Sequence, residues 1–345
     1  MSEISAPAPA PRRASALRAA RARAAGQAGK VVLVLLVGVI LGWVGFKASQ
    51  NVSIFWTVSL NGITLGALYF IVASGFTLIF GVMRVVNMAH GVLYLLGGWV
   101  GFHVLQSTGQ WGLGLLAATG IAAAVGLVIQ QLFLRWNQGQ DLRQAIITIA
   151  ISVIIADQIL SWYGGTARSI AWPDILDKSS PLYFFDLHYP FVRIFILLCA
   201  IAIGLGIWLW LSKTRTGMVV RAGVDDRQMV SALGVNIQLI FAIVFTVGSG
   251  LAGFSGMLGG SLISVGPGED VNFLINSLIV VIIGGMGSLG GAAIGALLLG
   301  LVDSWADVYL VFGDANYTNY SVVLTFILLV IVLAVRPLGL FGRPA

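Results

Sequence analysis

Residues 54–83 read IFWTVSLNGITLGALYFIVASGFTLIFGVM, and this stretch decides the fold class. It runs for 30 residues without a charged side chain, whereas about 20 apolar residues are enough to cross the hydrocarbon core of a bilayer. Within it, Gly62 and Gly66 are four residues apart. That spacing places small residues on one face of a helix and lets another helix approach closely. The stretch therefore predicts a membrane-spanning helix that packs against a neighbour.

Similar apolar runs recur along the whole chain. Of its 345 residues 58% are hydrophobic and only 9% are charged, against about 25% charged residues in soluble domains. The runs cover about 31–46, 54–83, 85–105, 111–134, 144–163, 190–212, 237–265, 271–302 and 318–335. They predict an all-α polytopic membrane protein with about eight to ten transmembrane or re-entrant helices. The one cysteine and three histidines supply neither a disulfide framework nor a metal site.

The basic residues indicate how the helices are oriented. Residues 1–30 are rich in alanine, proline and arginine and predict a disordered cytoplasmic tail, followed by a transmembrane domain over 31–337 and a short cytoplasmic end over 338–345. With the tail inside, 15 of the 19 basic residues lie on the inner face, as the positive-inside rule requires. The net charge of +6 therefore reflects membrane orientation, and no basic stripe with aromatic residues suggests nucleic acid.

This orientation requires the run at 271–302 to enter the membrane and return, because a single crossing would leave Arg336 on the outer face. The turning point is expected within 284–291, which reads GGMGSLGG, and two short arms would span the bilayer only partly. The cluster at 253–260, GFSGMLGG, also fits a broken helix of the kind that lines transport pathways. The alternative role for each of these glycines is close packing of helices, without a break or a turn.

Polar residues inside the apolar runs must face protein or water. His90 lies just after Arg84, so it either borders a pathway or is a helix-end residue bonded to a backbone carbonyl. Asp157 is the one intramembrane acid we identify, and a solvated position at the outer end of its helix is the alternative. Each alternative is a structural role without a ligand.

The inner loop at 213–236 differs from a simple turn. Asp225 is a candidate helix N-cap, Gln228 stands in a capping-box position and Gly234 is suited to the C′ position. The loop thus predicts a helix of two to three turns whose apolar face includes Met229 and Leu233. Such a face is covered either by the lipid surface or by the groove of a partner.

Four segments carry a resemblance to a known family. Residues 59–69 (SLNGITLGALY), 75–91 (GFTLIFGVMRVVNMAHG), 231–236 (SALGVN) and 284–295 (GGMGSLGGAAIG) resemble the permease of branched-chain amino acid ABC importers. The resemblance extends over roughly 55–337. The tail, the first helix and the pair Asp225 and Asp226 depart from the family pattern.

The resemblance implies a bacterial inner-membrane subunit that works with a second permease, two cytoplasmic ATPases and a solute-binding protein. ATP and Mg²⁺ would be used by those partners, because the chain lacks the Gly-x-x-x-x-Gly-Lys-[Ser/Thr] phosphate loop. Our hypothesis for the substrate pathway comprises Asn61, Gly62, Thr64, Ser74, Thr77, Asn87, His90, Asn276, Ser277, Gly284 and Gly285. The residues implied in ATPase coupling are Ala222, Gly223, Asp225, Asp226, Met229, Ala232, Leu233 and Gly234.

Three other functions remain open from the sequence. Related permeases transport urea or short amides, and the motifs do not separate these solutes from amino acids. A secondary carrier or channel would need more intramembrane acids than we identify. An intramembrane serine protease is suggested by Ser255 within Gly-Phe-Ser-Gly, but all three histidines precede that serine, whereas rhomboid proteases carry the base on a later helix.

Overall fold

The computed structural model describes residues 42, 45, 46, 49–176, 179–182, 187–225, 227–312, 315–316 and 320–342. The predicted tail at 1–30, nearly all of the first predicted helix, Asp226 and the last three residues lie outside this part. The first half contains α2 (Val52–Met83), α3 (His90–Thr108), α4 (Trp111–Ile129), a π-helical turn (Gln130–Leu134), a 3-10 turn (Arg135–Asn137) and α5 (Asp141–Tyr163).

The second half begins with a hairpin of β1 (Ser179–Leu182) and β2 (Leu187–Pro190), in which Ser179 pairs with Pro190. The helices that follow are α6 (Phe191–Lys213), α7 (Arg215–Asp225), α8 (Arg227–Ala232), α9 (Ile237–Leu262), α10 (Glu269–Gly284) and α11 (Leu289–Tyr309). A second hairpin, β3 (Val311–Phe312) with β4 (Ala315–Asn316), leads to α12 (Ser321–Val335).

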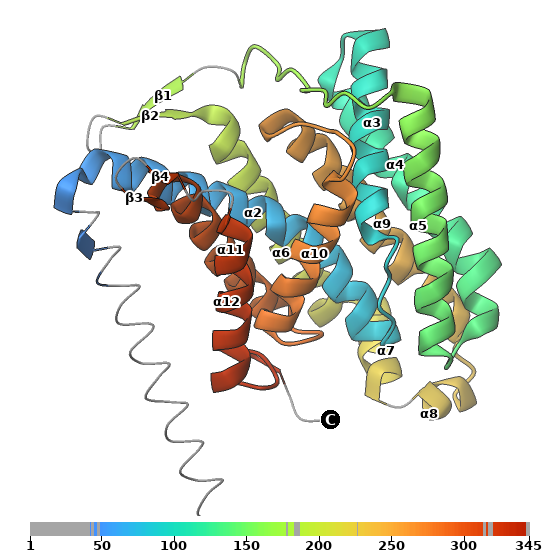
Figure 1. Cartoon of the computed structure of the whole chain (residues 1–345). Helices are drawn as coiled ribbons and strands as arrows, with labels where there is room; N and C mark the ends of the chain where they lie inside the picture. The colour runs from blue at the N-terminus through green and yellow to red at the C-terminus, as the bar shows by residue number, and fades with distance from the viewer. Residues whose placement is uncertain are drawn as a thin grey trace, which may run out of the picture.

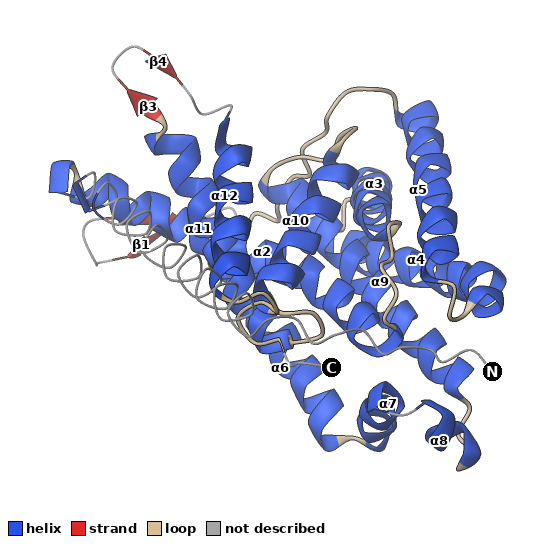
Figure 2. Ribbon diagram, turned by 60° about the horizontal axis from the view of Figure 1, so that its bottom comes forward, coloured by secondary structure: helices blue, strands red, loops and turns tan. Residues whose placement is uncertain are grey.

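These elements form a bundle of inclined helices, with both hairpins at one end and α7 and α8 at the other (Figures 1 and 2). Six of the described helices are long and apolar enough to cross a membrane. Together with α3, α10 and α12 they confirm the predicted all-α polytopic class. The hydrophobic core is centred on α2, where Leu68, Ile71 and Val72 are fully buried.

Glycine contacts bring the central helices together. A Cβ atom added to Gly62 of α2 would stand 2.9 Å from the carbonyl oxygen of Gly300 in α11, and one added to Gly66 would stand 2.8 Å from that of Ala296. At Gly75, the same hypothetical atom would meet the Gly248 carbonyl of α9. Backbones this close exclude any side chain, and the small residues supply the van der Waals contact that holds membrane helices together.

The glycine cluster at 253–260 does not break its helix, so that expectation is wrong. Helix α9 is continuous, and Gly253 and Gly256 lie against the backbones of α4 and α3 at Ala118 and Tyr94. Glycine lowers helix stability by about 1 kcal/mol, but here the neighbouring helices replace the missing side chains with backbone contacts. The Ser255 hydroxyl donates to the Ala252 carbonyl of the same helix at 2.7 Å.

The second glycine-rich segment does turn the chain, as predicted. Gly285 and Gly287 have φ of 97° and 84°, values that favour glycine because a Cβ is strained there. The backbone N–H groups of Leu340 and Phe341 donate to the carbonyls of Ile283 and Gly284 at 2.8 and 3.0 Å. The C-terminal segment and this turn therefore lie on one face of the bundle. Only the first arm is short, however, because α11 continues to Tyr309 and is long enough to cross.

Candidate functional site

Two predicted pathway residues on the first half of α2 contact the segment that enters α6. The amide oxygen of Asn61 accepts from the Arg193 guanidinium, and the hydroxyls of Thr64 and Tyr189 hydrogen-bond each other. Tyr189 also donates to the Leu60 carbonyl at 2.7 Å. These contacts satisfy the polar groups with protein partners, so they anchor the β1–β2 hairpin on the central helix.

The two serine hydroxyls of the predicted pathway are hydrogen-bonded to the backbone of their own helices. Ser74 donates to the Ile71 carbonyl at 2.7 Å, and Ser277 donates to the Phe273 carbonyl at 2.6 Å. Both side chains are buried. Back-bonding of this kind satisfies a hydroxyl inside an apolar helix without a ligand.

Thr77, Asn87 and His90 are buried where the end of α2 meets the start of α3. His90 Nε2 lies 2.9 Å from the Val72 carbonyl oxygen, which is the structural alternative considered for this residue. Within the described part of the chain, Thr77 Oγ1, Asn87 Nδ2 and His90 Nδ1 have no hydrogen-bond partner. Each of these three residues therefore has a buried polar atom without a partner in the described structure.

Asn276 belongs to a hydrogen-bond network that joins four helices. Its amide donates to the Tyr69 hydroxyl at 3.1 Å, and that hydroxyl donates to Asp303 at 2.9 Å. The other carboxylate oxygen of Asp303 accepts from Thr325 at 2.6 Å. The network thus connects α2, α10, α11 and α12.

The sequence analysis identified Asp157 as the one intramembrane acid and missed Asp303. The structure corrects this prediction. The apolar run was ended at Val302, one residue before Asp303, although the helix continues for seven residues past Val302. The available signal was the spacing of Asp303 and Asp307, which places both acids on one face of a helix. Tyr69 gave no signal because aromatic residues are common in apolar runs.

The inner loop contains two helices where one was predicted. Asp225 ends α7 and α8 begins at Arg227, so Asp225 is not the N-cap of α8. The predicted C-terminal stop is confirmed: Gly234 has φ of 81°, Gly234 N–H donates to the Ser231 carbonyl and Val235 N–H to the Val230 carbonyl. These two bonds form a Schellman motif.

Apolar residues of the predicted coupling module, which we define as residues 215–234, are accessible. Met229 and Leu233 are 64% and 77% exposed, and Ala222 and Ala232 are exposed as well, whereas Gly223 is buried. Two residues later, Asn236 caps α9 by accepting from the Leu239 N–H at 3.2 Å. The module is therefore linked to a central helix by a short and structured connection.

The glycines named for the pathway have structural roles. Gly62 faces Gly300 as described above, Gly284 faces Gly291 and Gly285 forms the turn after α10. Among the residues the structure covers, no group of three or more histidine, cysteine or acidic side chains is arranged to hold a metal ion.

Comparisons with known proteins agree with these features. Residues 58–333 match a family described as branched-chain amino acid transport system, permease component. The high-affinity branched-chain amino acid transport system permease protein LivH of Escherichia coli is 28% identical over 311 residues, which cover 86% of this chain and 98% of the relative. The corresponding protein BraD of Pseudomonas aeruginosa is 30% identical over 300 residues, which cover 83% and 95%.

A more distant relative is the probable branched-chain amino acid transport permease protein LivH of Methanocaldococcus jannaschii, 23% identical over 283 residues, or 79% of this chain and 88% of the relative. Among solved structures, PsaBC from Streptococcus pneumoniae in complex with Fab covers 85% of this chain and 95% of its own at 12% identity and a TM-score of 0.46. That likeness is too low to support an argument.

Proposed function

Since the chain belongs to the permease family of branched-chain amino acid transport systems, we propose that it forms half of the conduit of an ABC importer that moves aliphatic amino acids inward. It is a multi-pass protein of the inner membrane, with six described helices able to span it. The relatives above are named for branched-chain amino acids, which favours these solutes over urea and short amides.

The proposed assembly contains a second, similar permease, two cytoplasmic ATPases and a solute-binding protein outside the membrane. ATP and Mg²⁺ act in the ATPase subunits, since this sequence has no phosphate-binding loop of the Gly-x-x-x-x-Gly-Lys-[Ser/Thr] type. The division of labour leaves the permease with two tasks: to receive motion from the ATPases and to open a pathway at one face at a time.

The observation that carries the proposal is the exposed apolar surface of the coupling module. Met229 in α8 and Leu233 directly after it are exposed, and α8 lies with α7 at one end of the bundle (Figure 2). Fully burying one such side chain is worth about 1.5–3 kcal/mol, enough to make this surface a specific contact for an ATPase groove. A displacement of α8 passes through the capped start of α9 to the helices that α9 contacts, namely α2, α3 and α4.

The test is the variant Leu233→Glu in the assembled importer, reconstituted in proteoliposomes with its ATPases and binding protein. A charge inside an apolar groove is expected to release the ATPases or to uncouple ATP hydrolysis from uptake, with uptake at least tenfold lower. Leu338→Glu is the matched control, because Leu338 is 52% exposed and follows α12 at the same face. Wild-type uptake by Leu233→Glu would reject the docking role.

A second measurement tests the whole assignment. Purification in mild detergent is expected to recover ATPase chains together with the permease, and uptake is expected to require ATP. An isolated chain that accumulates leucine with a proton gradient alone would show that it is a secondary carrier.

A further inference from the structure

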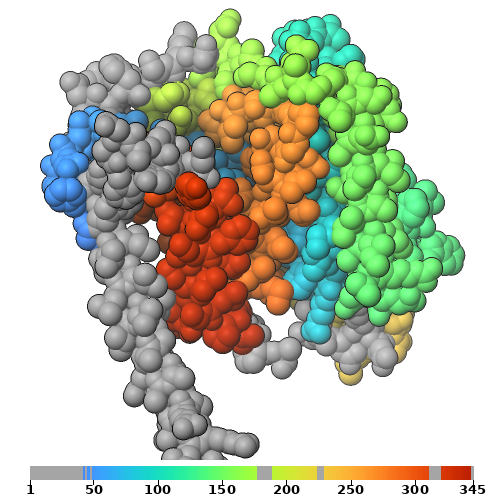
Figure 3. Space-filling view, viewed as in Figure 1, coloured from blue at the N-terminus to red at the C-terminus, as the bar shows by residue number. Residues whose placement is uncertain are grey.

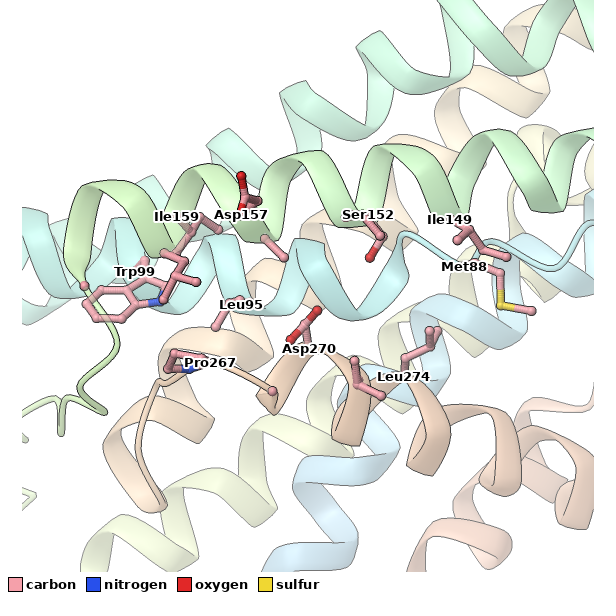
Figure 4. A pocket seen from close by; sticks show the side chains of 16 residues that line it. Met88, Leu95, Trp99, Ile149, Ser152, Asp157, Ile159, Pro267, Asp270 and Leu274 are labelled. Atoms are coloured by element: carbon pink, nitrogen blue, oxygen red, sulfur yellow. The ribbon is translucent and has the colours of Figure 1, made fainter.

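A cavity of about 420 Å³ lies between α3, α5 and the start of α10 (Figure 4). In the space-filling view the atoms of α3 form a strip between those of α10 and α5, the helices that line the cavity (Figure 3). Its apolar wall includes Leu95, Trp99, Ile149, Ile159 and Leu274. None of the pathway residues proposed from the sequence lines it.

One ionisable side chain is buried in this wall. Asp270 is 8% exposed and lies in the first turn of α10. Figure 4 shows its carboxylate directed into the cavity, toward the side on which Ser152 of α5 points inward. Among the described residues no hydrogen bond or ion pair of its side chain is found, its oxygens are not among the atoms sealed from solvent, and the neighbouring Glu269 is a second acid.

The position of Asp270 is fixed by the backbone. A Cβ atom added to Gly91 of α3 would overlap the carbonyl oxygen of Asp270 and approach Leu274 at 2.8 Å. Glycine at position 91 therefore lets α10 lie directly on α3, and this contact sets the position of the Asp270 carboxylate in the cavity. This approach requires a residue without a side chain at position 91.

An ionisable side chain among membrane-embedded apolar residues marks a binding or transport function. A nearby hydroxyl does not neutralise it, whereas an ammonium group does. The cavity volume is within the range of small-molecule sites and equals the space of about 14 water molecules at roughly 30 Å³ each. A primary ammonium on a branched aliphatic body matches the charge, the apolar wall and the size.

We propose that the α3–α5–α10 cavity is a membrane-embedded binding site for the transported amino acid, with Asp270 paired to its ammonium group and Leu95, Trp99 and Leu274 around its side chain. This inference rests on the proposed function and adds the location of the solute. Asp157 at the cavity rim is an exposed acid within an apolar helix. A charge in that position is expected to face water, and its carboxylate is directed away from the cavity (Figure 4).

The experiment measures binding of radiolabelled leucine to the permease–ATPase complex without the binding protein, in nanodiscs of phosphatidylglycerol alone. This lipid has no ammonium group that could occupy the site. 3-Methylbutylamine is expected to compete with leucine, and 4-methylpentanoate, which lacks the ammonium, is expected not to compete. Asp270→Asn is expected to weaken leucine binding at least tenfold, while Asp174→Asn, a change of the same charge in an exposed outer loop, leaves it unchanged.

A second variant separates loss of binding from loss of folding. Leu274→Trp keeps the carboxylate but fills the cavity, so it is expected to weaken leucine binding, and gel filtration checks the integrity of both variants. Unchanged binding in Asp270→Asn, equal competition by the amine and the acid, or no leucine binding by the wild-type complex would overturn the inference. ATP-driven leucine uptake by the wild-type importer in proteoliposomes, with its ATPases and binding protein, would show that the proposed function stands without this site.

Discussion

The substitution Gly62→Ala tests whether glycines of α2 serve packing or the substrate pathway. The added Cβ would stand 2.9 Å from both the Gly300 carbonyl oxygen and the Leu301 Cα, whereas carbon atoms in contact are about 3.5–4.0 Å apart. Both obstacles are backbone atoms, so the helices must separate by about 0.6 Å. Overpacking of this kind costs about 1–3 kcal/mol.

The matched control is Gly120→Ala in α4, where an added Cβ has no atom within 4 Å. Both variants gain up to about 1 kcal/mol of helix propensity, so their difference isolates the steric cost. In detergent, Gly62→Ala is expected to unfold at a lower temperature than Gly120→Ala, by about 2–4 °C for each kcal/mol. Equal unfolding temperatures would refute the packing argument, and normal stability with lost uptake would place Gly62 on the pathway.

Two further predictions concern the polar network and the coupling module. Tyr69→Phe leaves Asn276 Nδ2 and one Asp303 oxygen without their partner. Thermal unfolding is therefore expected to show a free energy of unfolding lower by about 1–2 kcal/mol. Additive effects of Tyr69→Phe and Asp303→Asn in a double-mutant cycle would contradict the contact. Gly234→Ala forces a Cβ into a φ of 81°, which costs about 1–2 kcal/mol. ATPase binding, measured by co-purification, is expected to fall at least fivefold, and unchanged binding would argue against the Schellman stop.

The helices and their direction follow from local properties of the chain. Uncharged runs such as 54–83 are long enough to span a bilayer, and the distribution of basic residues fixes which ends share a face. The need for a return between α10 and α11 followed from the position of Arg336 alone. Gly234 was predictable as a helix stop because the required φ is a property of a single residue.

The role of a glycine within a helix was not predictable from its neighbours. Residues 253–260 and 284–291 have the same composition of glycine with apolar residues, yet the first remains helical and the second turns. Glycine permits both outcomes. In α9 the approach of α3 and α4 favours the helix, while at Gly285 the C-terminal segment donates hydrogen bonds to the carbonyls left free at the end of α10.

Some features of the candidate site were likewise predictable from the sequence, and others were not. The sequence by itself determined the membrane-embedded class, the helix stop at Gly234 and the family motifs, because these depend on runs of adjacent residues. Only the tertiary structure decided that Tyr69 meets Asp303, 234 positions later, and that Asp270 enters a cavity against α5. Such meetings depend on how each helix is rotated and how closely backbones approach, and both are set by packing between distant segments.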